Sequence, residues 1–243
     1  MMRLVRWILD DYLRTQRIWV EWLAAIAIAY FALHTHSDTV STLATWSLSV
    51  IAFALYTTSV LADLAEQPVN LIRLLQLQSR RVYIGAHIIA ALLIVASSYA
   101  LLVLATYIVS PLAFPAWQTW LATLPAIAML SVTGVIIMLL LTPLVASPLQ
   151  RLTLLALIAV PLAWERVIAA LPDMLPGTVL AIFQAMSTVF GVILWPAMQL
   201  YALTINPQFS TVSMGLASIH VLVVIGLTAL VFRWYGRRTL SIA

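Results

Sequence analysis

Hydrophobic residues occur along this chain in long runs that are separated by short polar stretches. The runs cover residues 19–33, 43–62, 82–109, 119–141, 152–171 and 212–232. A helix needs roughly 20 apolar residues to cross a hydrocarbon core about 30 Å thick, and most of these runs approach or exceed that length. The pattern therefore predicts an all-α polytopic membrane protein, with six transmembrane helices in a single transmembrane domain that covers residues 1–243.

A seventh apolar stretch, residues 179–203, contains Pro196 and is followed by Asn206-Pro207. The arginines indicate whether this stretch crosses the membrane, because basic residues accumulate in cytoplasmic loops. With a cytoplasmic N-terminus and six crossings, eleven of the twelve arginines are cytoplasmic, whereas a seventh crossing would place the last three outside. We therefore predict a re-entrant outer hairpin over residues 172–210, with both termini in the cytoplasm. The eleven are Arg3, Arg6, Arg14, Arg17, Arg73, Arg80, Arg81, Arg151, Arg233, Arg237 and Arg238.

Tryptophan and tyrosine residues near the ends of the runs are typical of the membrane–water interface. Trp117 and Trp120 fit the outer side, and Trp19 and Trp22 fit the inner side. Trp46 fits neither side well.

The composition is 64% hydrophobic and 8% charged, which excludes a water-soluble fold of this size. The net charge of +4 reports membrane orientation here, and we expect no nucleic-acid partner. Cysteine is absent, so the chain has no disulfide, thiolate metal site or cysteine nucleophile. The arginine-rich N-terminus lacks a small-residue cleavage site, and we expect no removable signal peptide.

Residues 1–18 have two chemically different faces at helical spacing. This pattern predicts an interfacial helix on the inner leaflet. Two roles stay open for it: an anchor whose arginines contact anionic lipids, and a docking surface for a partner. The polar face contains Arg3, Arg6, Asp10, Arg14 and Arg17, and the apolar face contains Val5, Ile8, Leu9, Tyr12 and Leu13.

Residues 63–81 form the predicted cytoplasmic segment between the second and third spans. Pro68 suits the first turn of a short helix, and Val69, Ile72 and Leu75 then fall along one side of it. An exposed apolar strip requires a partner or a lipid surface to cover it. The alternative interpretation is an amphipathic linker that rests on lipid headgroups.

Three stretches of the sequence are typical of one family: LLQLQSRRVYIGAHIIAALLIVASS at residues 74–98, Asn206-Pro207, and FRWYGRR at residues 232–238. In these stretches the chain resembles the membrane subunits of type 2 ATP-binding-cassette (ABC-2) exporters. The chain departs from the family pattern at Gln78, where proline is common, and at His87, where lysine is common. The family's architecture matches the one expected here: an interfacial helix, six spans, a coupling helix between spans two and three, and an outer re-entrant hairpin.

The resemblance implies a permease subunit that forms the translocation path of an exporter. The implied partners are an ABC ATPase, a second permease subunit that is identical or homologous, and membrane lipids. The coupling segment then supplies the ATPase-docking residues, which are Glu66, Val69, Ile72, Arg73, Leu74, Leu75, Arg80 and Arg81.

Sequence motifs of catalysis are absent. The chain has no G-x-x-x-x-G-K-[ST], H-E-x-x-H or G-x-S-x-G, so we expect it not to be an enzyme and to hold no cofactor or metal. ATP and Mg²⁺ would bind to the partner ATPase. His34 and His36 fit solvated loop residues better than metal ligands, and we expect His87 and His220 to be neutral, hydrogen-bonded helix residues.

Charged residues within the spans are the remaining candidates for function. Glu165 and Arg166 are adjacent in the fifth span, where they either line a translocation path, support the hairpin, or sit at the outer boundary beside Pro172. Glu21 and Asp63, at the cytoplasmic ends of the first two spans, are expected to pair with nearby arginines.

A second function stays open, namely an ATPase-independent secondary transporter or membrane assembly factor. Transporters of that kind often contain paired broken helices in two similar halves, and here only the stretch at Pro196 is clearly interrupted. For either function we expect a multi-pass protein of the cell (inner) membrane.

Overall fold

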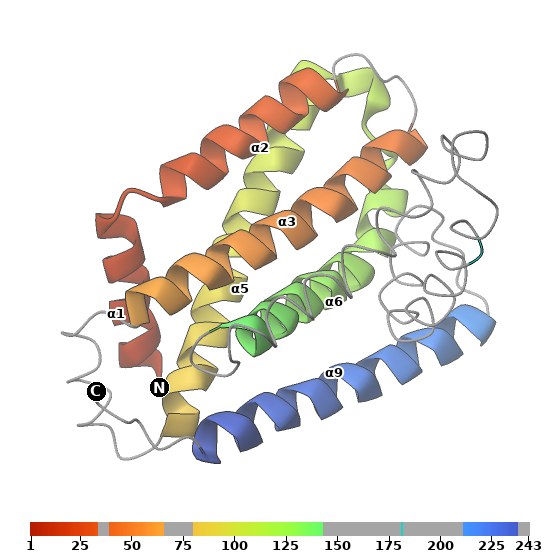
Figure 1. Cartoon of the computed structure of the whole chain (residues 1–243). Coiled ribbons are helices and arrows are strands. Elements are labelled where there is room, and N and C mark those ends of the chain that lie inside the picture. The colour runs from red at the N-terminus through yellow and green to blue at the C-terminus, as the bar shows by residue number, and fades with distance from the viewer. Residues whose placement is uncertain (34–38, 66–79, 143–180, 182–210, 238–243) are drawn as a thin grey trace.

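The computed structural model describes residues 1–33, 39–65, 80–142, 181 and 211–237, which form six long α-helices and one 3-10 turn (Figure 1). No strand occurs among these residues, so the described part of the chain is all-α, as predicted. The helices are α1 (Met2–Arg14), α2 (Ile18–Leu33), α3 (Thr39–Ala65), α5 (Arg80–Val109), α6 (Trp117–Leu141) and α9 (Thr211–Arg237), and the 3-10 turn is η1 (Pro111–Ala113).

Four of these helices are long and apolar enough to cross a membrane. They are α3, α5, α6 and α9, and they match the predicted second, third, fourth and sixth spans. The apolar part of α2, Ile18–Phe31, is shorter than these four. This composition is that of a multi-pass membrane protein. The predicted fifth span at 152–171 and the hairpin at 172–210 lie outside the described residues, apart from Ala181.

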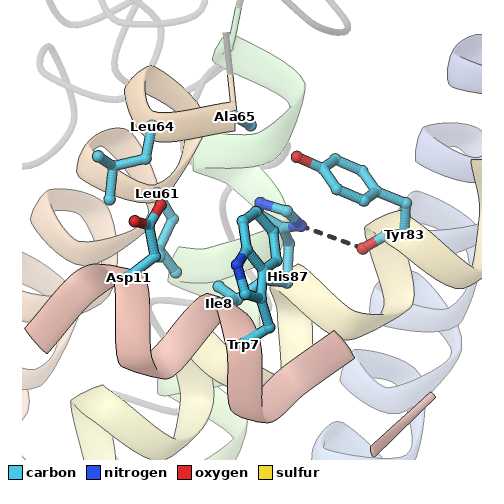
Figure 2. A pocket seen from close by; sticks show the side chains of 8 residues that line it. All are labelled: Trp7, Ile8, Asp11, Leu61, Leu64, Ala65, Tyr83 and His87. Carbon is cyan, nitrogen blue, oxygen red and sulfur yellow. Dashed lines mark hydrogen bonds between the residues drawn. The ribbon is translucent and has the colours of Figure 1, made fainter. Parts of the chain in front are cut away.

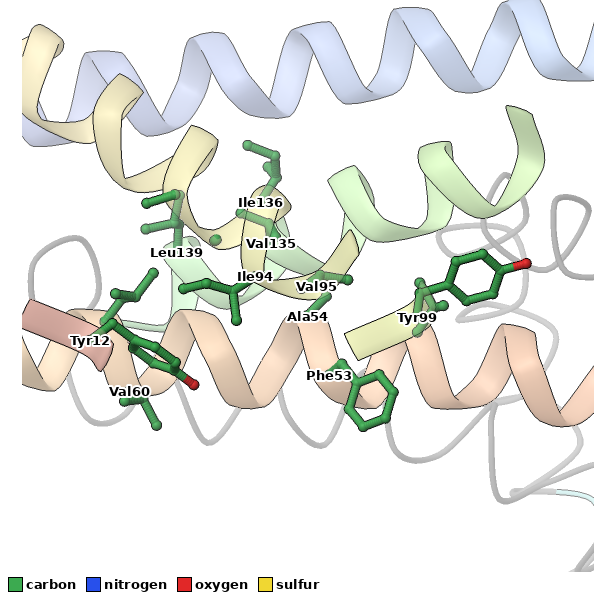
Figure 3. Close-up of a cluster of buried hydrophobic side chains, with 14 of the residues drawn as sticks. Tyr12, Phe53, Ala54, Val60, Ile94, Val95, Tyr99, Val135, Ile136 and Leu139 are labelled. Atoms are coloured by element: carbon green, nitrogen blue, oxygen red, sulfur yellow. The ribbon is translucent and has the colours of Figure 1, made fainter. Parts of the chain in front are cut away.

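Helix α5 is the centre of the packing, because it contacts each of the other five helices. Helix α3 packs between α5 and α6, and α9 packs on α6 and α5. Figure 3 shows part of the buried hydrophobic cluster around α3, α5 and α6, with Phe53 and Val60 directed to the side of α3 away from α6. The cluster includes Phe53, Ala54, Val60, Ile94, Val95, Val135, Ile136 and Leu139, all of which are buried.

The charged residues of the described chain gather at one end of the bundle. Helix α1, the end of α3, the start of α5 and the end of α9 lie together there (Figure 1). We call this the arginine-rich end. The described arginines are Arg3, Arg6, Arg14, Arg17, Arg80, Arg81, Arg233 and Arg237, and all of them belong to these segments or to the α1–α2 connection.

The opposite end contains the start of α3, the end of α5 and the start of α6 (Figure 1). The described residues there include no arginine and no carboxylate. We call it the uncharged end.

Helix α1 uses its apolar face to pack against protein. Val5, Ile8 and Tyr12 are buried, and α1 contacts α5 and α3. The apolar face that the sequence predicts for this helix is thus covered by the bundle at these three positions. Arg3, Arg6 and Arg14 remain exposed on the other face of the helix. A connection with Gln16 at a positive φ of 58° redirects the chain from α1 into α2.

Candidate functional site: a buried carboxyl group at the arginine-rich end

The predicted ATPase-docking residues fall mostly outside the described chain. Glu66, Val69, Ile72, Arg73, Leu74 and Leu75 belong to residues 66–79, and Glu165 and Arg166 belong to residues 143–180, so those predictions stay untested. Arg80 and Arg81 begin α5, and Arg81 is exposed. The structure thus describes two of the predicted docking residues, Arg80 and Arg81. The buried polar group that stands out in the described chain is the carboxyl group of Glu21.

Glu21, in the first turn of α2, is the most deeply buried charged side chain of the described residues, at 1% exposure. Its carboxyl group accepts three hydrogen bonds. Tyr12 and Thr57 donate to Oε1, with the Thr57 Oγ1–Oε1 distance at 2.6 Å, and Ser98 donates to Oε2 over 2.8 Å. We call these four residues the Glu21 cluster.

The Glu21 cluster joins four helices. Tyr12 comes from α1, Thr57 from α3 and Ser98 from the central helix α5, while the carboxyl group belongs to α2. Thr57 and Ser98 are 0% exposed, as is Tyr12. Through these side-chain hydrogen bonds the cluster fixes the position of α1 relative to α2, α3 and α5.

The predicted pairing of Glu21 with an arginine is wrong. Its hydrogen-bond partners in the described chain are hydroxyl groups, which lie 9, 36 and 77 residues away in the sequence. Arg14 and Arg17, the nearest arginines in the sequence, are exposed. An arginine in solvent keeps its hydration, whereas hydroxyl groups cost less to bury beside the carboxyl group. Asp63 is exposed near the end of α3, and its pairing stays a prediction.

Sequence analysis missed Tyr12, Thr57 and Ser98 as members of a site. Tyr12 had been placed on an apolar face, and Thr57 and Ser98 occur in apolar runs. The sequence feature that could have indicated them is the occurrence of two adjacent hydroxyl residues within an apolar run, Thr57-Thr58 and Ser97-Ser98. In each pair one hydroxyl bonds to its own helix and the other reaches Glu21: Thr58 donates to the Ala54 carbonyl and Ser97 to the Ile94 carbonyl.

Tyr12 is held in its protonated, donating form. Its pKa is raised well above the ordinary value, first by burial, then by its hydrogen bond to Glu21 and by the Glu21 charge. The Thr57 hydroxyl acts in the opposite direction. A phenol that stays protonated is a permanent donor to the carboxyl group across the physiological range.

A small cavity lies where α1 packs against α3 and α5 (Figure 2). Its volume of about 10 Å³ is close to what one water molecule needs. Trp7, Ile8 and Asp11 line it from α1, and Tyr83 and His87 line it from α5, with Leu61, Leu64 and Ala65 of α3 completing the wall. The buried Tyr83 hydroxyl has no protein partner among the described residues. The cavity is too small for a transported substrate.

Both histidines of the described spans are buried and hydrogen-bonded, as predicted. His87 Nδ1 lies 3.1 Å from the Tyr83 carbonyl, one turn earlier in α5. His220 Nε2 lies 2.8 Å from Thr133 Oγ1 and links α9 to α6. The described residues contain no group of three metal-binding side chains. His34 and His36 lie outside them.

The Glu21 cluster brings one carboxyl group into hydrogen-bonding contact with three hydroxyl groups. Comparison with known proteins adds no assignment. No family model, curated protein or solved structure matches this chain.

Proposed function

We propose that the chain is the membrane-spanning permease subunit of an ABC-type exporter, with ATP hydrolysed on a separate ATPase subunit. The observation that carries the proposal is the gathering of all described charged residues at one end of a bundle of long apolar helices. By the tendency of basic residues to remain inside, this end faces the cytoplasm. An exporter permease needs such an end, because its ATPase is cytoplasmic.

The connection between α3 and α5 supports this proposal. Helix α3 ends at Ala65 and α5 begins at Arg80, both at the arginine-rich end. The segment that joins them, residues 66–79, therefore starts and finishes on the proposed cytoplasmic side. It contains most of the docking residues that the family resemblance implies, among them Arg73 and Leu74.

The complete proposed topology has six spans and an outer re-entrant hairpin, with both termini in the cytoplasm. Helices α2, α3, α5, α6 and α9 supply five of the spans, and residues 152–171 supply the other. Helix α1 runs along the cytoplasmic boundary, with Arg3, Arg6 and Arg14 directed away from the bundle. A cytoplasmic location for Asn206 would contradict this topology.

The proposed assembly contains two permease subunits, identical or homologous, and two ATPases that bind ATP and Mg²⁺. Closure of the ATPases around nucleotide would move the coupling segments and, through α3 and α5, the rest of the bundle. Because α5 contacts every other described helix, a movement of its first turn is transmitted to all of them.

Co-purification tests the docking proposal. The chain is co-expressed with the ATPase encoded beside its gene, and the complex is isolated through a tag on the ATPase. We expect Leu74→Asp or Arg73→Glu to reduce recovery of the permease at least tenfold, because a central, desolvated interface residue contributes about 2 kcal/mol or more. Leu112→Asp is the matched control. Leu112 is 92% exposed in η1 at the uncharged end, so its substitution leaves docking unchanged.

Equal recovery of the unaltered chain and both docking variants would contradict the docking proposal. It would favour the second candidate function, an ATPase-independent secondary transporter or membrane assembly factor. The burial of Glu21 is the observation that favours the transporter, since a carboxyl group inside a membrane bundle often serves an ion or proton path. Transport that continues without the ATPase would identify that alternative.

A further inference from the structure

We propose that the Glu21 carboxyl group binds and releases a proton inside the folded bundle, and that its protonation state sets how firmly α1 is held. The ligand of the site is the proton. This inference concerns the Glu21 cluster alone and does not depend on the ATPase partner.

The hydrogen-bonding chemistry of the cluster permits both states. An ionised carboxylate only accepts hydrogen bonds, and here it accepts three. A protonated carboxyl group donates one and needs an acceptor. Each hydroxyl of the cluster can accept as well as donate, so one of them can receive that proton without any movement of the helices.

Thr57 and Ser98 have an alternative acceptor for their own hydrogens. Serine and threonine residues of the same helices donate to the backbone carbonyl three or four residues earlier: Thr58 to Ala54 O over 2.7 Å, and Ser97 to Ile94 O over 2.7 Å. Thr57 or Ser98 can turn toward its own helix in the same way. The hydroxyl oxygen is then free to accept from a protonated Glu21, and no buried donor is left without a partner.

The groups that face Glu21 are uncharged at neutral pH. Helix α1 contributes the Tyr12 phenol, α3 contributes Thr57, and α5 contributes Ser98. Tyr56 of α3 interacts electrostatically with Tyr12 and is also a phenol. Among the described residues, no arginine is a hydrogen-bond partner of Glu21.

Protonation changes the attachment of α1 more than that of the other helices. Tyr12 is the member of the cluster that belongs to α1, and its bond to an ionised carboxylate is stronger than its bond to a neutral carboxyl group. Val5 and Ile8 attach α1 through apolar contacts, and Asp11 of α1 interacts electrostatically with Tyr83 of α5, outside the Glu21 cluster. Helix α1 is therefore held more firmly when Glu21 is ionised and less firmly when it is protonated.

Infrared spectroscopy of the purified full-length protein in lipid nanodiscs tests the proton site directly. The spectrum is recorded across the pH range in which the protein stays folded. The chain has eight Asp and Glu residues, so the signal of Glu21 is the part of the carboxylic acid band that the unaltered protein has and Glu21→Gln lacks. We expect this part at low pH and its loss as the pH rises. Asp63→Asn is the matched control, because Asp63 is an exposed carboxylate of the same end, and this variant should keep the Glu21 band.

A carboxyl band that is identical in the unaltered protein and in Glu21→Gln at every pH would overturn the proposal. So would a buried carboxyl band that does not change over the whole range, because the group would then bind no exchangeable proton. The second outcome is read from the unaltered protein and from Asp63→Asn, so it stands even if Glu21→Gln folds poorly.

Limited trypsin digestion at fixed pH tests the effect on α1. Glutamine at position 21 reproduces the neutral side chain, and Arg14 and Arg17 provide exposed cleavage sites at the end of α1. We expect cleavage there to be roughly threefold to tenfold faster in Glu21→Gln than in the unaltered protein, as a weakened charge-assisted hydrogen bond would give. Asp63→Asn should be cleaved at the original rate. Equal rates in all three proteins would refute the link between Glu21 and α1.

Discussion

The two ends of the bundle both contain buried polar groups that join helices, but the groups differ in chemistry. In the Glu21 cluster, which begins at the first turn of α2 and reaches Ser98 near the middle of α5, hydroxyl groups from α1, α3 and α5 meet the carboxyl group of Glu21. Toward the uncharged end, Trp46 of α3 donates through Nε1 to Thr106 of α5 over 3.1 Å. The first network contains a group that can change its charge, and the second does not.

The uncharged end is reinforced by aromatic contacts. The Trp46 ring packs edge-on against Tyr99, with centroids 6.1 Å apart, and against Phe114, with centroids 5.5 Å apart. Tyr99 in turn accepts a hydrogen bond from Trp120 Nε1 over 3.2 Å. Such contacts combine large apolar area with satisfied polar atoms, and their strength does not vary with pH near neutrality.

The comparison indicates a division of roles between fixed and adjustable attachment. The aromatic network holds α3, α5 and α6 together permanently, whereas the Glu21 cluster holds α1 through a bond whose strength depends on charge. The following substitutions test this division, beginning with the largest expected effect.

Trp46→Ala is expected to cause the largest loss of stability, about 3–5 kcal/mol, because it removes a fully buried aromatic side chain and leaves a cavity. The free energy of unfolding is measured by denaturant titration in detergent micelles. Trp117→Ala is the control, since Trp117 is 65% exposed at the start of α6 and should cost far less. Similar losses in the two variants would show that the aromatic network does not hold the uncharged end.

Trp46 also shows what the sequence could and could not predict. Its position disagreed with the expected aromatic belt, and the structure explains this because the ring is buried between helices. By contrast, the predicted runs at 82–109 and 119–141 match Arg80–Val109 and Trp117–Leu141 closely. Helix length follows from local hydrophobicity, which a single sequence contains, whereas the partner of a side chain follows from packing.

Glu21 illustrates the same limit at the candidate site. A carboxylate at the start of an apolar run was correctly singled out, but sequence proximity favoured arginines as its partners. The actual partners, Thr57 and Ser98, come from spans two and three and meet it only once α2, α3 and α5 pack together. The apolar face of α1 was likewise identified from its periodicity, while the surface that covers it was not.

Gly134→Ala tests the packing between the two ends, where α3 and α6 approach closely. A methyl group at Gly134 would lie 2.8 Å from the Cβ of Ala54, which is fixed to the backbone of α3 and cannot turn away. We expect a loss of about 1–3 kcal/mol from the overpacked contact, measured by the same denaturant titration.

Gly226→Ala is the matched control for that substitution. A methyl group there meets nothing within 4 Å, and alanine favours helix by about 1 kcal/mol over glycine, so this variant should be neutral or slightly more stable. If both glycine variants lost the same free energy, the α3–α6 contact would not be the cause. The α3–α6 contact would then not be a rigid connection between the two ends of the bundle.

Tyr12→Phe and Thr106→Val give the smallest expected effects and the sharpest comparison of the two ends. Each removes a hydroxyl group from a buried hydrogen bond between helices, and we expect each to cost about 1 kcal/mol. They should differ in pH dependence when the free energy of unfolding is measured from neutral to alkaline pH.

The direction of that difference follows from the raised pKa of Tyr12 in the folded protein. A raised pKa means that the stabilising contribution of Tyr12 is fully present below the unfolded-state pKa of about 10 and is lost as the pH rises above it. The stability gap between the unaltered protein and Tyr12→Phe should therefore shrink above about pH 10. The gap for Thr106→Val should stay constant, because neither Trp46 nor Thr106 ionises there. Parallel behaviour of the two variants would mean that the two ends respond to charge alike, contrary to the division between fixed and adjustable attachment.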